Sequence, residues 1–281
     1  MKTVIVGDIG GQYDVFRDVV ESVGGDPDTC VLPADLVMVQ VGDIVRFADA
    51  PALNSLACAE YAQKLIDNNA GRYIQMLGNH ETPLLGGALD PHWGVRDLPE
   101  SRPIVQRWWD DRLAYFGVGL HKDGHKDVLI THSGLTRGYA EWLGTETVFD
   151  TVRKLNSFVG NVGFQEFENP GRLVTGEDNP CADMVWATVG MELHDSWKGA
   201  HPAFNQIHGH SCLMEWESEE FWYDIPQYVR DATVVNYRDR YTLTAYESGY
   251  TVRSVDWVLK NKYRRMEWPL LVLDGYHVVL Q

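Results

Sequence analysis

The strongest constraint on the fold is a pattern that recurs along the first half of the chain. A short apolar run rich in β-branched residues ends, and polar side chains or glycine follow at once. Runs of this length and composition are typical of strands that are buried on both faces. The pattern predicts strands at residues 2–6, 35–41, 72–77 and 127–131.

Helical patterns lie between these runs. Phe16, Val19, Val20 and Val23 are spaced as on one face of a helix, which Gly24 ends. A second amphipathic helix is predicted over about residues 52–69. Strands that alternate with helices favour an α/β fold with a mostly parallel sheet.

The second half of the chain is less periodic. Its strand-like runs lie near residues 204–208, 232–237, 241–246 and 270–280. Their spacing favours antiparallel or mixed strands that complete a second sheet. Because the sequence has no Pro/Ser-rich linker and no internal repeat, we expect one domain over residues 1–281, with residues 213–281 completing the sheet.

Composition narrows the class of partner. The formal net charge of −16 over 281 residues disfavours a long nucleic acid or an acidic membrane surface as a partner. No apolar run approaches about 18 residues, so no membrane span is expected. The N-terminal apolar run is too short for a secretory signal, and the four scattered cysteines fit reduced thiols, so we expect a cytoplasmic protein.

The polar side chains that follow the strands are candidate metal ligands. Because the carboxyl ends of parallel strands share one edge of a sheet, we expect these side chains to lie close together. Carboxylate oxygens, amide oxygens and neutral imidazoles suit Mn²⁺, Fe²⁺ or Zn²⁺. Two such ions about 3.5–4 Å apart can clamp a phosphate and activate a water. The candidates are Asp8, Asp43, Asn79, His80, His132, His208 and His210.

In this order the residues resemble the signature of the calcineurin-like metallophosphoesterases, and within them the phosphoprotein-phosphatase-type branch. The match runs over about residues 3–212. The resemblance implies an α/β fold of two mixed β-sheets packed as a sandwich and flanked by helices, with a dinuclear metal centre at one edge. The motifs stand as Gly7-Asp8-Ile9-Gly10-Gly11, Gly42-Asp43-Ile44-Val45-Arg46, Gly78-Asn79-His80-Glu81, Thr131-His132-Ser133-Gly134 and Gly209-His210-Ser211.

The resemblance also implies a role for each matching residue. Asp43 bridges two divalent ions, Mn²⁺ by preference, and Asp8 serves one of the two sites. His80 is the proton donor to the leaving oxygen, a role that suits an imidazole with a pKa near neutrality. The other site is completed by Asn79, His132 and His210.

The first motif departs from the family at Gly10, where the family carries a histidine ligand. The site that Asp8 serves is therefore short of protein ligands, and we expect it to be the weaker of the two. Water, Gln12 and the thiolate of Cys212 are candidates to fill it. His208, next to the late motif, is a candidate ligand or a core neighbour of the site.

The second motif departs at Arg46, which stands where the family has an aspartate that orients the motif histidine. Glu81 and Asp49 are candidates to replace that carboxylate. The planar guanidinium of Arg46 suits phosphate oxygens, so Arg46 is a candidate catalytic residue that contacts the substrate.

These residues predict a metal-dependent phosphoesterase that uses a metal-activated water on a small phosphate ester, with a nucleotide as a candidate substrate. A diester carries less charge than a monoester, so one weak metal site favours phosphodiesterase activity, with 2′,3′-cyclic nucleotides as one candidate and monoesterase activity on model substrates.

Other functions stay open at this point. Similar-looking relatives include protein Ser/Thr phosphatases and dinucleoside-polyphosphate hydrolases. A third alternative, from a different class, is a pseudo-enzyme that binds phospho-ligands at a decayed site. The intact Gly-Asn-His-Glu motif argues against decay, because His80 has little reason to persist in a binding module.

Overall fold

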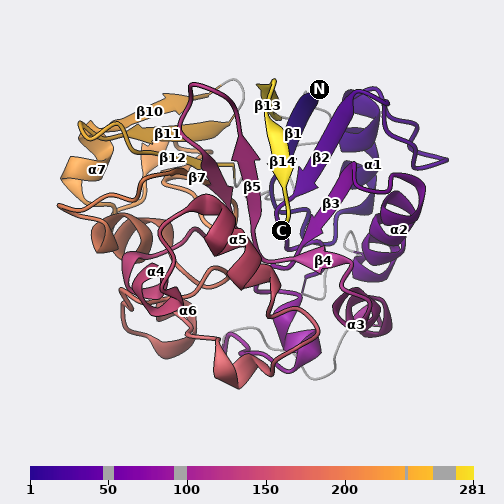
Figure 1. Ribbon diagram of the computed structural model, residues 1–281, viewed down its shortest axis with the longest axis horizontal. Coiled ribbons are helices and arrows are strands. Elements are labelled where there is room, and N and C mark those ends of the chain that lie inside the picture. The colour runs from indigo at the N-terminus through magenta and orange to yellow at the C-terminus, as the bar shows by residue number, and fades with distance from the viewer. Residues whose placement is uncertain (47–53, 92–99, 238–239, 256–269) are drawn as a thin grey trace.

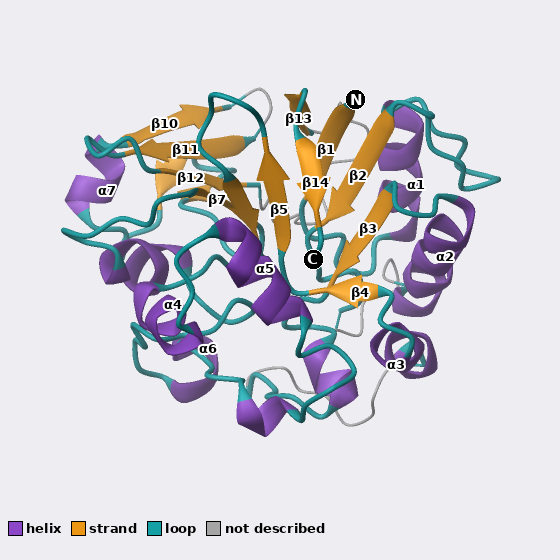
Figure 2. Ribbon diagram, in the orientation of Figure 1, coloured by secondary structure: helices purple, strands orange, loops and turns teal. Residues whose placement is uncertain are grey.

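The computed structural model describes residues 1–46, 54–91, 100–237, 240–255 and 270–281. Two mixed sheets stand side by side, with helices on their outer faces (Figures 1 and 2). The expected α/β fold of two mixed sheets flanked by helices is therefore confirmed.

The first sheet contains the early strands of the sequence. Its strands β1 to β4 are parallel, and β13 joins β1 in the antiparallel direction. Figure 1 shows the first three α-helices on its outer side. In spatial order the strands are β13 (Leu271–Asp274), β1 (Lys2–Val6), β2 (Leu36–Gln40), β3 (Tyr73–Met76) and β4 (Ala114–Tyr115), and the helices are α1 (Tyr13–Ser22), α2 (Ser55–Asn68) and α3 (Arg102–Asp110).

The second sheet mixes parallel and antiparallel pairs, as the irregular spacing of its strands predicts. β7 is parallel to β6 and to β12, and the other neighbours are antiparallel. In spatial order its strands are β10 (Thr233–Asn236), β11 (Tyr241–Ala245), β12 (Thr251–Ser254), β7 (Asn205–His208), β6 (Val128–Ile130), β5 (Val118–His121) and β14 (His277–Val279).

The remaining elements lie in the connections of the second half. A small hairpin follows the late Gly-His motif, and four short α-helices, two tighter 3₁₀ turns and one wider π-helical turn complete the described elements. The hairpin is β8 (Met214–Glu215) and β9 (Glu220–Phe221); the helices are α4 (Arg137–Leu143), α5 (Val148–Asn156), α6 (Arg172–Thr175) and α7 (Gln227–Asp231); the turns are η1 (Thr82–Leu85), η2 (Phe164–Glu166) and η3 (Val189–His194).

Alternation of side chains along each strand divides the core into two layers. Ile5, Val39 and Ile74 of the first sheet meet Leu120 and Ile130 of the second sheet in one buried cluster. The residues between them on each strand point outward to the helices. This arrangement is why both faces of these strands are apolar.

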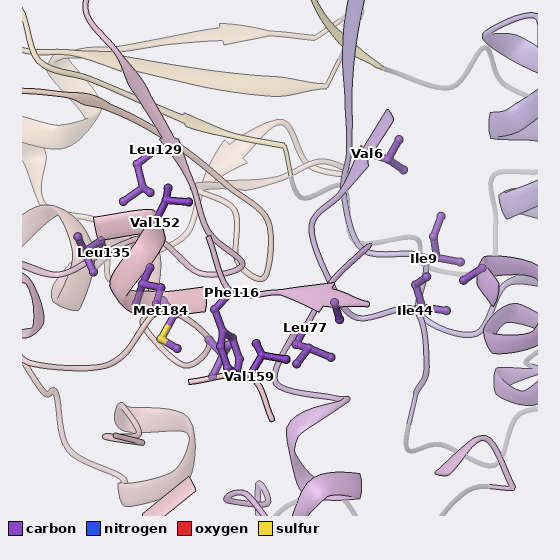
Figure 3. Close-up of a cluster of buried hydrophobic side chains, with 14 of the residues drawn as sticks. Val6, Ile9, Ile44, Leu77, Phe116, Leu129, Leu135, Val152, Val159 and Met184 are labelled. Atoms are coloured by element: carbon purple, nitrogen blue, oxygen red, sulfur yellow. The ribbon is translucent and has the colours of Figure 1, made fainter. Parts of the chain in front are cut away.

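The outer layer anchors the motif loops. Ile9 and Ile44, each the residue after a motif aspartate, are completely buried and point into the cluster shown in Figure 3, near Val6 and Leu77. Because each isoleucine is held in the core, the aspartate before it is directed towards the sheet edge.

The prediction of one strand over residues 270–280 is wrong in one respect. The run turns at Gly275, whose φ is +75°, and its two halves join different sheets. β13 pairs with β1, whereas β14 pairs with β5. An apolar run of alternating residues does not by itself reveal a crossing between two sheets.

The described helices give no candidate for a membrane span. The longest of them, α2, has 14 residues, and none of the described helices combines the length and the hydropathy that a bilayer crossing requires.

Candidate metal centre

Five of the predicted site residues come from loops at the carboxyl ends of five strands. Asp8 follows β1, Asp43 follows β2 and Asn79 follows β3. His132 and His210 follow β6 and β7 in the second sheet. Residues far apart in the sequence therefore meet where the two sheets adjoin.

The closest group consists of Asp43, His132 and His210. One potential ligand atom from each lies within 4.8 Å of the other two. The Nε2 atom of His132 is 3.4 Å from a carboxylate oxygen of Asp43, and the two imidazole centres are 5.0 Å apart. Such spacing allows one ion to contact all three side chains.

Asn79 lies at the centre of this group. Its Oδ1 atom is 2.9 Å from Nδ1 of His210 and 2.9 Å from Nε2 of His132. With the amide turned over, its nitrogen would lie 3.0 and 3.2 Å from the carboxylate oxygens of Asp43. A carboxylate, an amide and two imidazoles thus converge on one point with more acceptors than donors, which is the arrangement that a cation neutralises.

The orientation of His132 is fixed from behind. Its Nδ1 lies 2.9 Å from the carbonyl oxygen of Val41, a partner to which only an N–H can donate. The lone pair is therefore on Nε2, which faces Asn79 and Asp43. Burial lowers the pKa of His132 well below its usual value, so the ring is neutral and able to bind a metal.

His210 and Asp8 meet at the edge of the group. The backbone N–H of His210 donates to the Asp8 carboxylate at 3.2 Å, and that carboxylate is 4.0 Å from Nδ1 of His132. Burial lowers the pKa of His210 to about 3. Among the described residues, its buried Nε2 atom has no hydrogen-bond partner.

Two residues of this group have a strained backbone. Asp43 has a φ of +54° and His210 a φ of +60°, in the left-handed region that most residues avoid. Such strain persists only where the surrounding structure enforces it. Gly78 permits the close approach, because a Cβ atom there would lie 2.2 Å from Oδ1 of Asp43.

Glu81 holds two motif loops together. Its carboxylate is completely buried and accepts hydrogen bonds from the backbone N–H groups of Asp43, Val45 and Gly78 at 2.8–3.0 Å. Burial raises the pKa of Glu81, and these backbone donors oppose the rise. Glu81 and Asp49 are the two carboxylates expected to orient His80. Glu81 binds the backbone of the motif loops, and Asp49 lies outside the described residues.

Two buried glutamines support the same loops, and the sequence analysis missed them. Gln40 donates to the carbonyl oxygens of Gly7 and Gly42 and accepts from the N–H of Gly42. Gln75 donates to Gln40 at 2.7 Å. The signal was present: each is a polar residue inside an otherwise apolar strand, where an unpartnered amide is costly.

His80 lies beside Asp43. Its backbone N–H donates to Oδ1 of Asp43 at 2.9 Å, and its Nε2 is 3.6 Å from Oδ2. Burial, with smaller contributions from Arg46 and His210, lowers the pKa of His80 to about 3. The expectation of a pKa near neutrality therefore differs from the structure, because burial and a neighbouring cation both disfavour the imidazolium.

Arg46 lies beside Gly10. A Cβ atom built on Gly10 would be 3.7 Å from Nη1 and 3.8 Å from Cδ of Arg46. The N–H of Gly10 donates to the carbonyl of Asp43 at 2.7 Å, which fixes the two loops against each other. The two departures from the family pattern thus meet in space, which the sequence alone did not reveal.

The three further candidate ligands make contacts of other kinds. The Gln12 amide is 3.4 Å from the carbonyl of Ile9, and the thiol of Cys212 donates to the carbonyl of Met214 at 3.0 Å. His208 is completely buried, with Nδ1 2.8 Å from the carbonyl of Gly209. Their roles as ligands stay predictions.

The donor set fits one divalent ion well. Asp43, Asn79, His132 and His210 supply oxygen and nitrogen atoms at one point, with neutral imidazoles and a fixed tautomer. Beside Gly10, where the family has a histidine, a guanidinium nitrogen lies 3.7 Å from the point where a side chain on residue 10 would begin.

Comparisons with known proteins agree with the motif analysis. Residues 1–100 match the calcineurin-like phosphoesterase family, which confirms the expected resemblance. A symmetrical bis(5′-nucleosyl)-tetraphosphatase of Glaesserella parasuis serovar 5 (strain SH0165) is 28% identical over 176 residues, covering 59% of this chain. The chain spans 56% of the length of that relative.

Two solved structures resemble the fold more distantly. A cold-active protein-tyrosine phosphatase of a psychrophilic Shewanella species has a TM-score of 0.43 and 18% identity, covering 66% of this chain and 56% of that chain. A mutant cold-active protein tyrosine phosphatase has a TM-score of 0.48 and 16% identity, covering 91% of this chain and 70% of that chain.

Proposed function

We propose that this chain, a calcineurin-like phosphoesterase and thus a phosphoric ester hydrolase, acts on a small phosphate that is substituted on two sides. Phosphodiesters, including 2′,3′-cyclic nucleotides, belong to this class. The observation that carries the proposal is the convergence of Asp43, Asn79, His132 and His210 beside His80 and Arg46.

The cluster supplies a site for a divalent ion, with Mn²⁺ as our first candidate. When bound, such an ion offsets phosphate charge and lowers the pKa of a coordinated water. The residues themselves set the geometry: Val41 fixes the ring of His132, and Glu81 holds the loops of Asp43 and Asn79. The water-poor surroundings strengthen every charge interaction there.

His80 is the proposed donor to the leaving oxygen. It lies against Asp43 with its side chain 16% exposed, so a substrate can reach it. In the free protein the ring is neutral and carries one N–H. A phosphate anion beside it favours the imidazolium, so substrate binding raises its pKa towards the range useful for proton donation.

The charge at the reacting phosphorus favours a doubly substituted phosphate. A monoester dianion brings two negative charges, whereas a diester brings one. Because the donors fit one divalent ion well and the cation beside Gly10 is a guanidinium, a singly charged phosphoryl group suits the available positive charge better.

A second candidate is a dinucleoside polyphosphate. The specific observation in its favour is the curated relative, which is named as a symmetrical bis(5′-nucleosyl)-tetraphosphatase. An internal phosphoanhydride also presents a phosphorus with two substituents and one charge. The same charge argument therefore covers both substrates.

The test is a substrate panel with Mn²⁺. The panel contains bis(4-nitrophenyl) phosphate, 4-nitrophenyl phosphate, 2′,3′-cyclic AMP, diadenosine tetraphosphate and a phosphoserine peptide. We expect a larger kcat/KM for the diester than for the monoester, and loss of activity with chelator. A strong preference for the monoester or the phosphopeptide would overturn the proposal, and no turnover at all would favour a phospho-ligand-binding pseudo-enzyme.

Variants assign the chemistry to the site. His80→Asn should lower kcat by roughly 10²–10⁴-fold, as expected for loss of a general acid. The matched control is His125→Asn, because His125 is an exposed histidine of the β5–β6 hairpin. Equal activity of the two variants would remove His80 from the reaction.

A further inference from the structure

The geometry points to Arg46 as a built-in substitute for the second cation: one divalent ion binds per chain, and the guanidinium supplies the other positive charge to the phosphate. This inference rests on the proposed function for its substrate chemistry. It makes two claims that binding alone can test, the number of ions and the contribution of Arg46 to anion affinity.

The ligands beside Gly10 differ from those around Asn79. Asp8 and Asp43 are the candidate carboxylates there, and residue 10 itself supplies no imidazole. The Asp8 carboxylate already accepts the N–H of His210, and the Cys212 thiol is directed to a backbone carbonyl. The described donors therefore concentrate on the side of Asn79 and His132 rather than around Gly10.

The neighbour of Gly10 in the folded chain is Arg46. Arg46 lies 3.7 Å, at Nη1, from the point where a side chain on residue 10 would begin. Its guanidinium therefore lies beside the loop that carries Asp8. A permanent cation at this place repels a second metal ion and attracts a phosphate.

Hydrogen bonds hold the backbone around Arg46 on two sides. Its backbone N–H donates to the Ser55 hydroxyl at 2.9 Å, and that hydroxyl donates back to the Arg46 carbonyl at 3.2 Å. The N–H of Gly11 donates to the carbonyl of Ile44 at 2.7 Å. The backbone that carries Arg46 is thus tied both to the start of α2 and to the loop of Asp8.

The guanidinium of Arg46 can bind phosphate but does not coordinate a water. A guanidinium presents parallel N–H donors that match two oxygens of one phosphate, and it keeps its charge at every physiological pH. Unlike a divalent ion, it brings one charge and no coordinated water. The substitution therefore preserves anion binding while it removes one site for a water nucleophile.

Metal counting tests the first claim. Protein equilibrated with excess Mn²⁺, desalted and measured by elemental analysis should hold one ion per chain. Gly10→His combined with Arg46→Ala restores an imidazole and removes the cation, so it should hold two. Retention of two ions by the unaltered protein would overturn the inference, as would a folded double variant that still holds one.

Anion binding tests the second claim. Titration of the Mn²⁺-loaded protein with inorganic phosphate should show a Kd that rises about 10-fold or more in Arg46→Ala and less in Arg46→Lys. Arg137→Ala is the matched control, since Arg137 is an exposed arginine paired with Glu141 on α4. An unchanged Kd in Arg46→Ala would overturn the inference.

The outcomes separate this inference from the proposed function. One bound ion and Arg46-dependent phosphate binding support the inference even if no ester in the panel is hydrolysed. Two bound ions with good diester hydrolysis would leave the proposed function standing and remove the inference. Thermal unfolding of each variant shows whether it is folded, and the ion count of the unaltered protein decides the first claim alone.

Discussion

Two loops of this protein begin with the same three residue types and take different parts in the site. Gly7-Asp8-Ile9 and Gly42-Asp43-Ile44 each follow a parallel strand, and both isoleucines are completely buried. Asp43 nevertheless has a left-handed backbone and lies in the ligand cluster, whereas Asp8 lies beside it.

The difference arises from what holds each loop. The second loop is bound by the buried side chains of Glu81 and Gln40. The first loop is bound largely by the second, through the N–H groups of Gly10 and Gly11. Identical local sequence therefore gives a structural hierarchy, in which the surroundings rather than the motif decide which aspartate becomes the central ligand.

The largest expected effect separates the two aspartates. Asp43→Asn should weaken Mn²⁺ binding by more than about 100-fold, because even supporting residues of metal sites contribute 10–100-fold. Asp8→Asn should weaken it by less than about 10-fold, since Asp8 stands outside the closest ligand group. Calorimetric titration measures both, and equal losses would contradict the hierarchy.

Gly78 tests the close approach that the second loop requires. In Gly78→Ala the new methyl group would meet the Asp43 carboxylate at 2.2 Å, so the loop must shift. We expect a loss of metal affinity and of about 1–3 kcal/mol in the free energy of unfolding.

The matched control for that variant is Gly163→Ala. A Cβ atom at Gly163 would have its nearest neighbour, a carboxylate oxygen of Glu166, at 3.8 Å, and the backbone there is extended. Urea denaturation and Mn²⁺ titration should give this variant the same free energy of unfolding and the same affinity for Mn²⁺ as the unaltered protein. If both alanine variants behave alike, the steric argument at Gly78 fails.

Glu81 tests the support of the second loop directly. Glu81→Gln leaves one acceptor oxygen where the carboxylate satisfies three backbone donors, so we expect a loss of about 1–3 kcal/mol in the free energy of unfolding. Glu166→Gln, at an exposed carboxylate, should change stability little. Equal urea midpoints for the two variants would show that Glu81 is not the support described.

A second buried carboxylate, Asp183, provides a test by pH. It accepts backbone hydrogen bonds from Asn169 and Val185, and its segment contacts the loop of His132 through Ser133. Burial raises the pKa of Asp183 to about 7. The folded state thus keeps a proton that the unfolded state releases near pH 4, so this carboxyl makes stability fall as pH rises from about 4 to 7.

Asp183→Asn removes that titration. Relative to the unaltered protein, the variant should gain up to about 4 kcal/mol in unfolding free energy between pH 4 and pH 8. Only this change with pH is diagnostic, because the loss of one acceptor shifts stability equally at every pH. Urea denaturation at several pH values measures it, and parallel curves would show that Asp183 titrates normally.

Much of this fold could be predicted because its strands carry a local signal. The runs at 2–6, 35–41 and 72–77 are short, apolar and followed by polar residues, and each is a strand within one residue of those limits. The ligand candidates followed from one topological rule, that parallel strands bring their carboxyl ends to one edge. The four cysteines, which all lie in the described part of the chain, form no disulfide with one another.

What could not be predicted depends on contacts across the sequence. The meeting of Arg46 with Gly10, and the binding of loop backbone by Glu81, arise from segments that come together only in the folded chain. The low pKa of His80 depends on burial, which motif spacing does not report. The crossing at Gly275 depends on two sheets whose edges lie near each other.

That crossing has a consequence for the order in which the protein forms. β1, which leads into the loop of Asp8, pairs on one side with β2 and on the other with residues 271–274. During synthesis, β1 would leave the ribosome long before this second neighbour, with one edge unpaired. Residues up to 274 must therefore be made before the strand that leads into the first motif is protected from pairing with another molecule.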